Sequence, residues 1–152
     1  MMLNFKKGVT VLEVLVVLAI LGILLVIILP SFKTMRDNQI LKSAASDIFS
    51  ALDRARSETL SSVNSSEYGV HFQSDKIVVF QGKVYSSSDP DNENISIYSP
   101  ATISAINLTG GAVDLYFNRL SGAPDKTGTV TVSVSALSKV ITISATGTAS
   151  MN

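Results

Sequence analysis

The sequence contains no cysteine and a single histidine among its 152 residues. Without cysteine the chain has no disulfide framework, thiolate zinc site, iron–sulfur cluster, lipid-anchored cysteine or cysteine nucleophile. One histidine leaves almost no room for a Ser/His/Asp triad or a multi-histidine metal site. No phosphate-binding loop or dinucleotide fingerprint is present either. These absences exclude most classes of enzyme, and we expect neither catalytic residues nor a cofactor.

Charge of neither sign predominates, because 12 lysines and arginines balance 12 acidic residues. No basic excess therefore favours nucleic acid as a partner, and no lysine or arginine follows Lys139. The composition is instead apolar, with 46% hydrophobic and only 16% charged residues. Where these apolar residues lie along the chain therefore decides what they do in the fold.

The apolar residues gather near the N-terminus. Residues 14–29 include no polar side chain, and Glu13 is the only ionisable residue within 9–32. A membrane helix needs about 20 apolar residues, so residues 9–29 are predicted to cross a bilayer. Lys6 and Lys7 precede this segment and favour a cytoplasmic N-terminus, although Lys33 and Arg36 on the far side reduce the asymmetry.

A cleaved secretory signal is the alternative interpretation of this segment. Its apolar region usually spans about 7–15 residues and ends at a small-residue cleavage site. The present segment is longer, and the sequence Ile28-Leu29-Pro30-Ser31-Phe32 offers no such site. The pattern therefore favours a retained membrane helix.

The junction before the helix carries a specific motif: Lys6-Lys7-Gly8-Val9-Thr10-Val11-Leu12-Glu13. It resembles the processing and methylation signal of type IV pilins and type II secretion pseudopilins. The resemblance implies that a prepilin peptidase cuts between Gly8 and Val9 and that the new amine of Val9 is methylated. Gly8 suits this role because a protease draws extended backbone into its site. Val9 departs from the commoner Phe or Met but stays apolar.

Glu13 is the residue to which the resemblance gives the clearest assembly role. A carboxylate in lipid is unfavourable by about 2.5–3.5 kcal/mol, and such residues usually have a function. The resemblance implies that Glu13 pairs with the methylated amine of a neighbouring subunit's first residue, within an assembly segment that includes Thr10 and Leu12. A carboxylate lying at the headgroup boundary is the alternative. Gly22 and Pro30 are predicted to kink the helix.

Beyond Pro30 the pattern becomes amphipathic, with small and apolar residues three or four positions apart at Leu41, Ala45, Ile48, Leu52, Ala55 and Thr59. The charged residues between them are expected mostly to face water: Lys33, Arg36, Asp37, Lys42, Asp47, Asp53, Arg54, Arg56 and Glu58. Asp53 with Arg56, and Arg54 with Glu58, have the spacing of helical ion pairs. One helix from Val9 to about Leu60 would be nearly 80 Å long, at about 1.5 Å per residue.

The remaining residues alternate in the manner of short strands. Candidate strands are 67–73, 76–81, 95–98, 102–108, 112–118, 128–135 and 139–145, and residues 136–138 are predicted to join the last two. The fold class is therefore α+β, with the long N-terminal helix packed on an antiparallel sheet or small β-sandwich. We divide the chain into a leader (1–8), a membrane or filament-core half-helix (9–32), an amphipathic half-helix (33–60) and a β-rich head (61–152).

Three segments, one at the end of the helix and two in the head, resemble a single branch of pseudopilins, the GspH/FimT-type minor pseudopilins. They are Ala55-Arg56-Ser57-Glu58, Phe117-Asn118-Arg119-Leu120-Ser121-Gly122, and residues 140–147. Some minor pilins of this branch take up DNA through a basic C-terminal region. That activity is not carried over, because this C-terminus lacks basic residues after Lys139.

Two local features admit a binding role. Asp89, Asp91 and Glu93 alternate as in calcium loops, but the segment lacks the glycine and distal glutamate of an EF-hand, so a solvated loop is preferred. His71 has no second histidine or cysteine with which to complete a metal site and is interpreted as a structural or surface residue.

These observations predict a non-enzymatic minor pseudopilin of a type II secretion pseudopilus. The resemblance implies as partners other pseudopilins or pilins, prepilin peptidase, an inner-membrane assembly platform, membrane lipid and secreted cargo. The expected location is the bacterial inner membrane, with one span and a periplasmic head, and then the filament. A minor or major type IV pilin is the first alternative, and a monomeric membrane-anchored β-rich binding module is the second.

Overall fold

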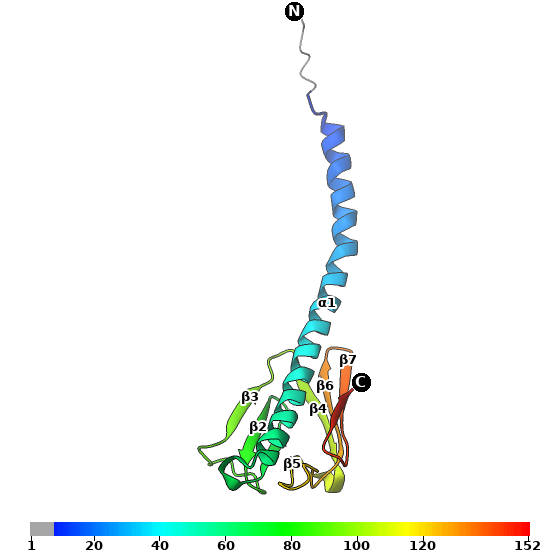
Figure 1. The fold of residues 1–152 in the computed structure, drawn as a ribbon. Helices are drawn as coiled ribbons and strands as arrows, with labels where there is room; N and C mark the ends of the chain where they lie inside the picture. The colour runs from blue at the N-terminus through cyan, green and yellow to red at the C-terminus, as the bar shows by residue number, and fades with distance from the viewer. Residues whose placement is uncertain (1–7) are drawn as a thin grey trace, which may run out of the picture. The chain divides into compact units, whose positions relative to one another are not determined.

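The computed structural model describes residues 8–152, apart from the side chains of 27–31. The predicted leader, except for Gly8, therefore lies outside the described residues. The chain forms two compact units, Met1–Arg36 and Asp37–Asn152, and helix α1 (Val11–Leu60) contributes to both. Figure 1 traces the order of the elements.

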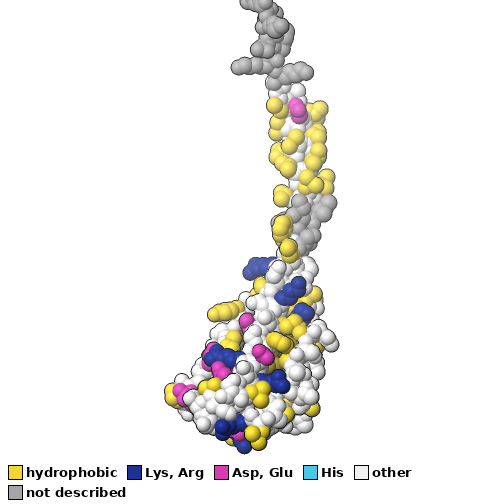
Figure 2. All heavy atoms as spheres, viewed as in Figure 1, with side chains coloured by type: hydrophobic (Ala, Val, Ile, Leu, Met, Phe, Trp, Pro, Cys, Tyr) yellow, Lys and Arg dark blue, Asp and Glu magenta, His cyan; other side chains and the backbone are white. Residues whose placement is uncertain are grey.

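In the first unit α1 begins directly after Thr10 and continues through Gly22 and Pro30. The kink predicted at these two residues stays a prediction. Every large apolar side chain described in this unit before residue 27 is at least 47% exposed, and Figure 2 shows them along its surface. Such a surface requires lipid or other helices as its environment.

The apolar segment predicted to span a membrane, residues 9–29, reaches into the positions whose side chains lie outside the description. Within the residues that the structure does describe, no helix combines the length and apolarity required to cross a bilayer.

In the second unit the predicted stripe of α1 forms the centre of the core. Its six residues, Leu41, Ala45, Ile48, Leu52, Ala55 and Thr59, are all at most 3% exposed, which confirms the stripe. The hydroxyl of Thr59 is satisfied because it donates to the carbonyl of Ala55 at 2.8 Å and accepts from the amide of Tyr68 at 2.9 Å. These bonds allow a polar side chain to be fully buried.

Among the described residues eight strands form two antiparallel four-stranded sheets, which confirms the α+β class. The first sheet has the order β3-β2-β1-β5, and the second has the order β4-β6-β7-β8. The strands are β1 Tyr68–Phe72, β2 Lys76–Gln81, β3 Glu93–Ser96, β4 Thr102–Leu108, β5 Asp114–Tyr116, β6 Gly128–Val134, β7 Leu137–Ile143 and β8 Ala149–Met151. Two 3-10 turns, η1 Val63–Ser65 and η2 Thr109–Gly111, complete the head.

The sheets lie on either side of the head portion of α1 (Figure 1). Alternate residues of each sheet point to the helix and close one core, among them Val70, Phe72, Ile77, Val130, Val132 and Ile141. The alternation follows from the period of two in a strand. The second unit is thus a helix packed between two sheets. The strand patterns had predicted either one antiparallel sheet or a small β-sandwich on the helix.

Several strand boundaries differ from those predicted. β3 begins at Glu93, and β8 has no counterpart among the predicted strands, because its three residues Ala149–Met151 carry little β-pattern. β7 begins at Leu137, which pairs with Val134, so the hairpin turn is Ser135-Ala136. Ser135 adopts φ 54, and such a positive φ matches a two-residue turn to the twist of the strands.

Candidate processing and assembly site

The predicted cleavage position lies on non-helical backbone immediately before α1. Residues 8–10 have no regular structure, Gly8 and Thr10 are exposed, and the Val9 side chain is 72% exposed. A Cβ added to Gly8 would meet no atom within 4 Å, so nothing in the described chain requires a glycine there for packing. The Gly8–Val9 bond therefore has the accessible, unfolded backbone that a protease needs.

Thr10 and Glu13 are joined at the start of the helix. The amide of Glu13 donates to Thr10 Oγ1 at 3.2 Å, and the amide of Val14 donates to the carbonyl of Thr10 at 3.2 Å. Thr10 is thus the N-cap of α1, and the Thr-x-x-Glu spacing is that of a capping box. A carboxylate in the first turn also interacts favourably with the helix dipole. This cap was not predicted from the sequence, although the Thr-x-x-Glu spacing carried the signal.

The structure places Val9 and Glu13 along the same surface hollow of about 280 Å³, which Val14, Val17 and Leu18 complete. Leu12, the third predicted assembly residue, is 72% exposed and does not line the hollow. One carboxylate among apolar side chains creates a surface that suits an apolar helix carrying one positive charge.

In the head, Arg56 connects the three segments that carry the branch resemblance. Its Nε donates to the carbonyl of Gly122 at 3.1 Å, and its Nη2 donates to the carbonyl of Thr146 at 3.2 Å. Arg56 was expected to face water, and it is instead partly buried, because its guanidinium satisfies two turn carbonyls.

Asp37 is a second charged residue for which exposure was wrongly expected. It is buried, and its Oδ2 accepts a hydrogen bond of 3.0 Å from the hydroxyl of Ser135. This bond ties the first residue of the second unit to the turn between β6 and β7. The hydroxyl compensates for part of the desolvation of the carboxylate.

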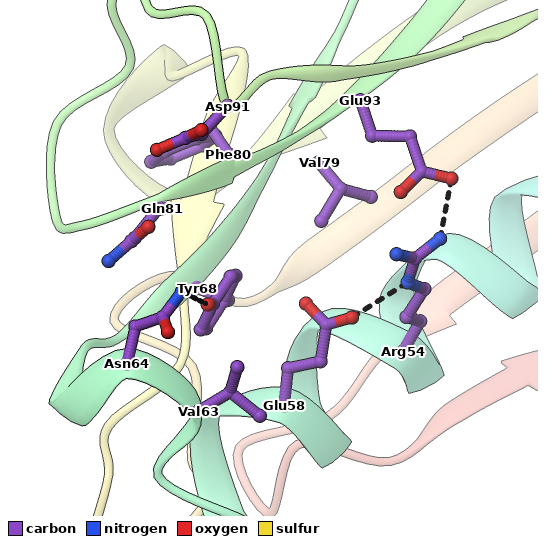
Figure 3. A pocket seen from close by; sticks show the side chains of 10 residues that line it. All are labelled: Arg54, Glu58, Val63, Asn64, Tyr68, Val79, Phe80, Gln81, Asp91 and Glu93. Atoms are coloured by element: carbon purple, nitrogen blue, oxygen red, sulfur yellow. Dashed lines mark hydrogen bonds and ion pairs between the residues drawn. The ribbon is translucent and has the colours of Figure 1, made fainter.

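A pocket of about 230 Å³ lies beside the C-terminal turns of α1 (Figure 3). There Arg54 pairs with Glu58, as the sequence spacing predicted, and also with Glu93 of β3. The hydrogen bond to Glu58 is the main reason that the pKa of Arg54 is raised, and the bond to Glu93 adds to it. Asn64 Nδ2 donates to the hydroxyl of Tyr68 at 3.3 Å on another wall of the pocket.

The calcium candidates Asp89, Asp91 and Glu93 are not grouped around one point in the described chain. Asp89 Oδ1 accepts from the amide of Asp91 at 3.0 Å, which closes a local turn, while Glu93 is paired with Arg54. Across residues 8–152, where described, no group of three His, Cys, Asp or Glu side chains is arranged to hold a metal ion. The loop is thus organised by its own hydrogen bonds.

His71 stacks on Tyr85, with ring centroids 3.9 Å apart and planes inclined by 9°. Its Nδ1 is buried without a hydrogen-bond partner in the described residues. Burial lowers the pKa of His71, nearby Lys76 lowers it further, and the charge of Asp114 opposes the shift. The ring of this β1 residue therefore packs face to face against Tyr85.

The comparisons with known proteins identify the N-terminal motif. Residues 3–29 match the family described as "Prokaryotic N-terminal methylation motif". No curated protein and no solved structure matches the chain. The chain therefore carries a type IV pilin-like prepilin signal, which is consistent with the pilin and pseudopilin superfamily. The motif implies processing by prepilin peptidase, assembly with other pilin-type subunits, and a membrane-anchored stage before the filament.

Proposed function

We propose that the chain is a minor pseudopilin, a non-enzymatic structural subunit of a type II secretion pseudopilus. The observation that carries the proposal is the methylation motif at residues 3–29. Its expected cut lies on exposed backbone before α1, and its single carboxylate lies in the first helical turn. Both features are those that processing and helical assembly require.

Processing would release the leader after Gly8 and leave a methylated amine on Val9. The amine would then lie one residue before the N-cap of α1, next to the hollow that Glu13 lines. In the filament this amine of one subunit pairs with Glu13 of the next. At about 4 Å the attraction of opposite unit charges is about 4 kcal/mol at an effective dielectric near 20. Pairing therefore offsets much of the unfavourable placement of Glu13 in an apolar environment.

The apolar surface of the first unit supports a place in the inner membrane before assembly, with the head in the periplasm. Its exposed valine, leucine and isoleucine side chains would exchange lipid for the helices of neighbouring subunits. Thr10 and Leu12 flank Glu13 and complete the assembly segment. An inner-membrane platform would lift the subunit, and secreted cargo would meet the filament. The presence of Glu13 argues against the tip-most position, where the family's subunits commonly lack this acid.

A cross-linking experiment in the native membrane tests this proposal. A photoreactive amino acid at Leu12, whose side chain is 72% exposed, would be activated and its adducts identified by mass spectrometry. We expect adducts with other pseudopilins, which disappear with Glu13→Gln and persist in a control bearing Lys42→Gln on the head. Adducts only with type IV pilins would show that the subunit belongs to a type IV pilus and not to a secretion pseudopilus. Adducts with no pilin-type protein would overturn the proposal.

A further inference from the structure

A fully exposed leucine stands on a well-ordered turn of the head. The side chain of Leu120 is 101% exposed. The amide of Gly122 donates to the carbonyl of Asn118 at 2.8 Å, which closes the turn around it. Arg119 Nη1 donates to the carbonyl of Ser65 at 2.8 Å and fastens the turn to the segment after α1. Because the turn is ordered in advance, a contact made by Leu120 loses little backbone entropy.

This turn lies at the end of the head where α1 ends (Figure 1). A Cβ on Gly122 would lie 3.0 Å from the side chain of Leu60, the last residue of α1. Leu60 is itself 45% exposed, and Val63, three residues on, is 40% exposed. Within the described residues no carboxylate pairs with the guanidinium of Arg119. We call Leu120 and Arg119 the knob, an apolar side chain next to a positive charge.

A hollow of about 170 Å³ lies at the other end of the head, between the start of the head portion of α1 and the connection from β3 to β4. It is lined by Ile40, Ser43, Ala44, Asp47, Tyr98 and Ser99. An apolar cavity of about 150 Å³ is large enough to hold benzene, so this hollow admits the side chain of a leucine. Asp47 is the one charged residue of the lining, and no cation in the described part of the chain pairs with its carboxylate. The hollow therefore complements the knob in both size and charge.

The knob and the hollow cannot meet within one chain. Ala44 and Leu60 are 16 positions apart on α1, which separates them by about 24 Å at about 1.5 Å per residue. We infer that Leu120 of one copy enters the hollow of the next copy, with Arg119 facing Asp47. Because the two surfaces differ, the contact is head-to-tail, and such contacts repeat along an open filament when they do not close into a ring.

This inference deepens the proposed function and rests on it for the filament, but not for the two complementary surfaces. It requires at least two successive copies of the chain in the assembly. The exposed tyrosine of the hollow, Tyr98, would then be covered by the neighbouring copy, as would Leu120. Burial of these apolar side chains stabilises the contact, and the pair of charges fixes its orientation.

Disulfide trapping tests the contact, because the chain contains no cysteine of its own. Leu120→Cys and Ser43→Cys would be combined in the full chain, and the membranes that contain it oxidised. Cysteines with Cα atoms more than about 7 Å apart cannot be bridged, so positions 120 and 43 can be joined only between copies. We expect a ladder of dimers and higher multimers, with each disulfide joining position 120 to position 43.

The matched control replaces Ser43→Cys by Ser138→Cys. Ser138 is also exposed and follows the turn that bonds to Asp37, so it lies near the same end of the head but outside the hollow. The control pair should leave the chain mainly monomeric. An absence of multimers from the first pair, equal yields from both pairs, or disulfides only between two copies of position 120 would overturn the inference.

Charge reversal tests the orientation. Arg119→Glu and Asp47→Arg should each lower the yield of multimers about threefold to fivefold, because like charges then face each other. Combining the two reversals should restore the yield, which a folding defect in either variant would not allow. Failure of the combination to exceed the single reversals would contradict the pairing of Arg119 with Asp47.

A photoreactive amino acid in place of Leu120 identifies the partner in native membranes. We expect adducts to residues 40–47 or 98–99 of a second copy of this chain. Adducts only with another protein, including a different pilin-type subunit, would overturn the self-contact. Cleavage after Gly8 and methylation of Val9 are read from the mass of the same samples, so failure of this inference and failure of the proposed function are distinguishable.

Discussion

Arg56 Nε lies 3.1 Å from the carbonyl oxygen of Gly122 and donates a hydrogen bond to it, which joins α1 to the turn after Phe117. Gly147 packs against the same carbonyl. A Cβ on Gly147 would lie 2.0 Å from that oxygen and 2.9 Å from Arg56 Nε, and the residue has φ +80. The end of α1 is thereby fixed to turns from both sheets, and the close contact at Gly147 leaves no room for a side chain.

Gly147→Ala should destabilise the head strongly, because the new methyl group collides with backbone. Gly110 is the matched control, since its φ of +78 is nearly the same but a Cβ there meets nothing within 4 Å. Both variants share the strain of a positive φ, so their difference isolates the collision. We expect Gly147→Ala to lose at least about 2 kcal/mol more than Gly110→Ala in urea unfolding of the full chain. Equal losses would show that the packing around Gly122 is loose.

The bond between Ser135 and Asp37 should appear as coupling between two distant positions. In a double-mutant cycle of Asp37→Ala and Ser135→Ala, we expect a coupling free energy of about 0.5–1.5 kcal/mol. Ser135 has a positive φ, and any strain that alanine adds there cancels in the cycle, because the Ser135→Ala change is made both with and without Asp37. A cycle of Lys42→Ala with Ser135→Ala provides the comparison, since Lys42 is exposed, and it should give no coupling. Additive effects of Asp37 and Ser135 would contradict the bond.

His71 should make folding depend on pH. Because burial lowers its pKa below the ordinary value of 6.5, the unfolded chain binds a proton more readily than the folded chain. The contribution of His71 to stability is therefore complete above about pH 7.5 and declines as the pH falls through 6.5 toward the lowered folded pKa. Ring resonances of this single histidine report the pKa directly. His71→Gln should remove the corresponding part of the pH dependence of the urea midpoint, and an unchanged dependence would contradict the assignment.

Thr10 should hold the first turn of α1 in place. Thr10→Ala removes the acceptor of the Glu13 amide and should weaken the turn by about 1 kcal/mol, which raises hydrogen exchange of that amide roughly fivefold. Thr10→Ser, which keeps the hydroxyl, is the control and should leave exchange near that of the original chain. If alanine and serine behave alike, the hydroxyl does not cap the helix.

The sequence predicted those features that depend on periodicity. The stripe from Leu41 to Thr59 follows from apolar residues spaced three or four apart, as on one face of a helix. The hairpin of β1 and β2 follows from alternation with a period of two. Both patterns are local and do not depend on how distant segments pack. The roles of Arg56 and Asp37 could not be predicted in this way. Their partners lie 66 and 98 residues away, and only the packing of both sheets on α1 brings the turns to them.

The motif residues were predictable for a different reason. Gly8, Val9 and Glu13 stand in a fixed local order and lie within the matched residues 3–29. The pocket at Arg54 had only its pair with Glu58 as a sequence signal, because Glu93 joins it from another strand.

The intact mass of the chain recovered from its native membrane tests the central claim most directly. We predict a chain that starts at a methylated Val9, and we predict that replacement of Gly8 by a bulky residue such as tryptophan leaves the leader attached. The exposed position of Gly8 makes a folding defect an unsuitable explanation for that loss, since a Cβ added there meets no atom of the described chain within 4 Å. A chain that keeps Met1 or Met2 without the substitution, or one cut beyond Phe32, would contradict the account.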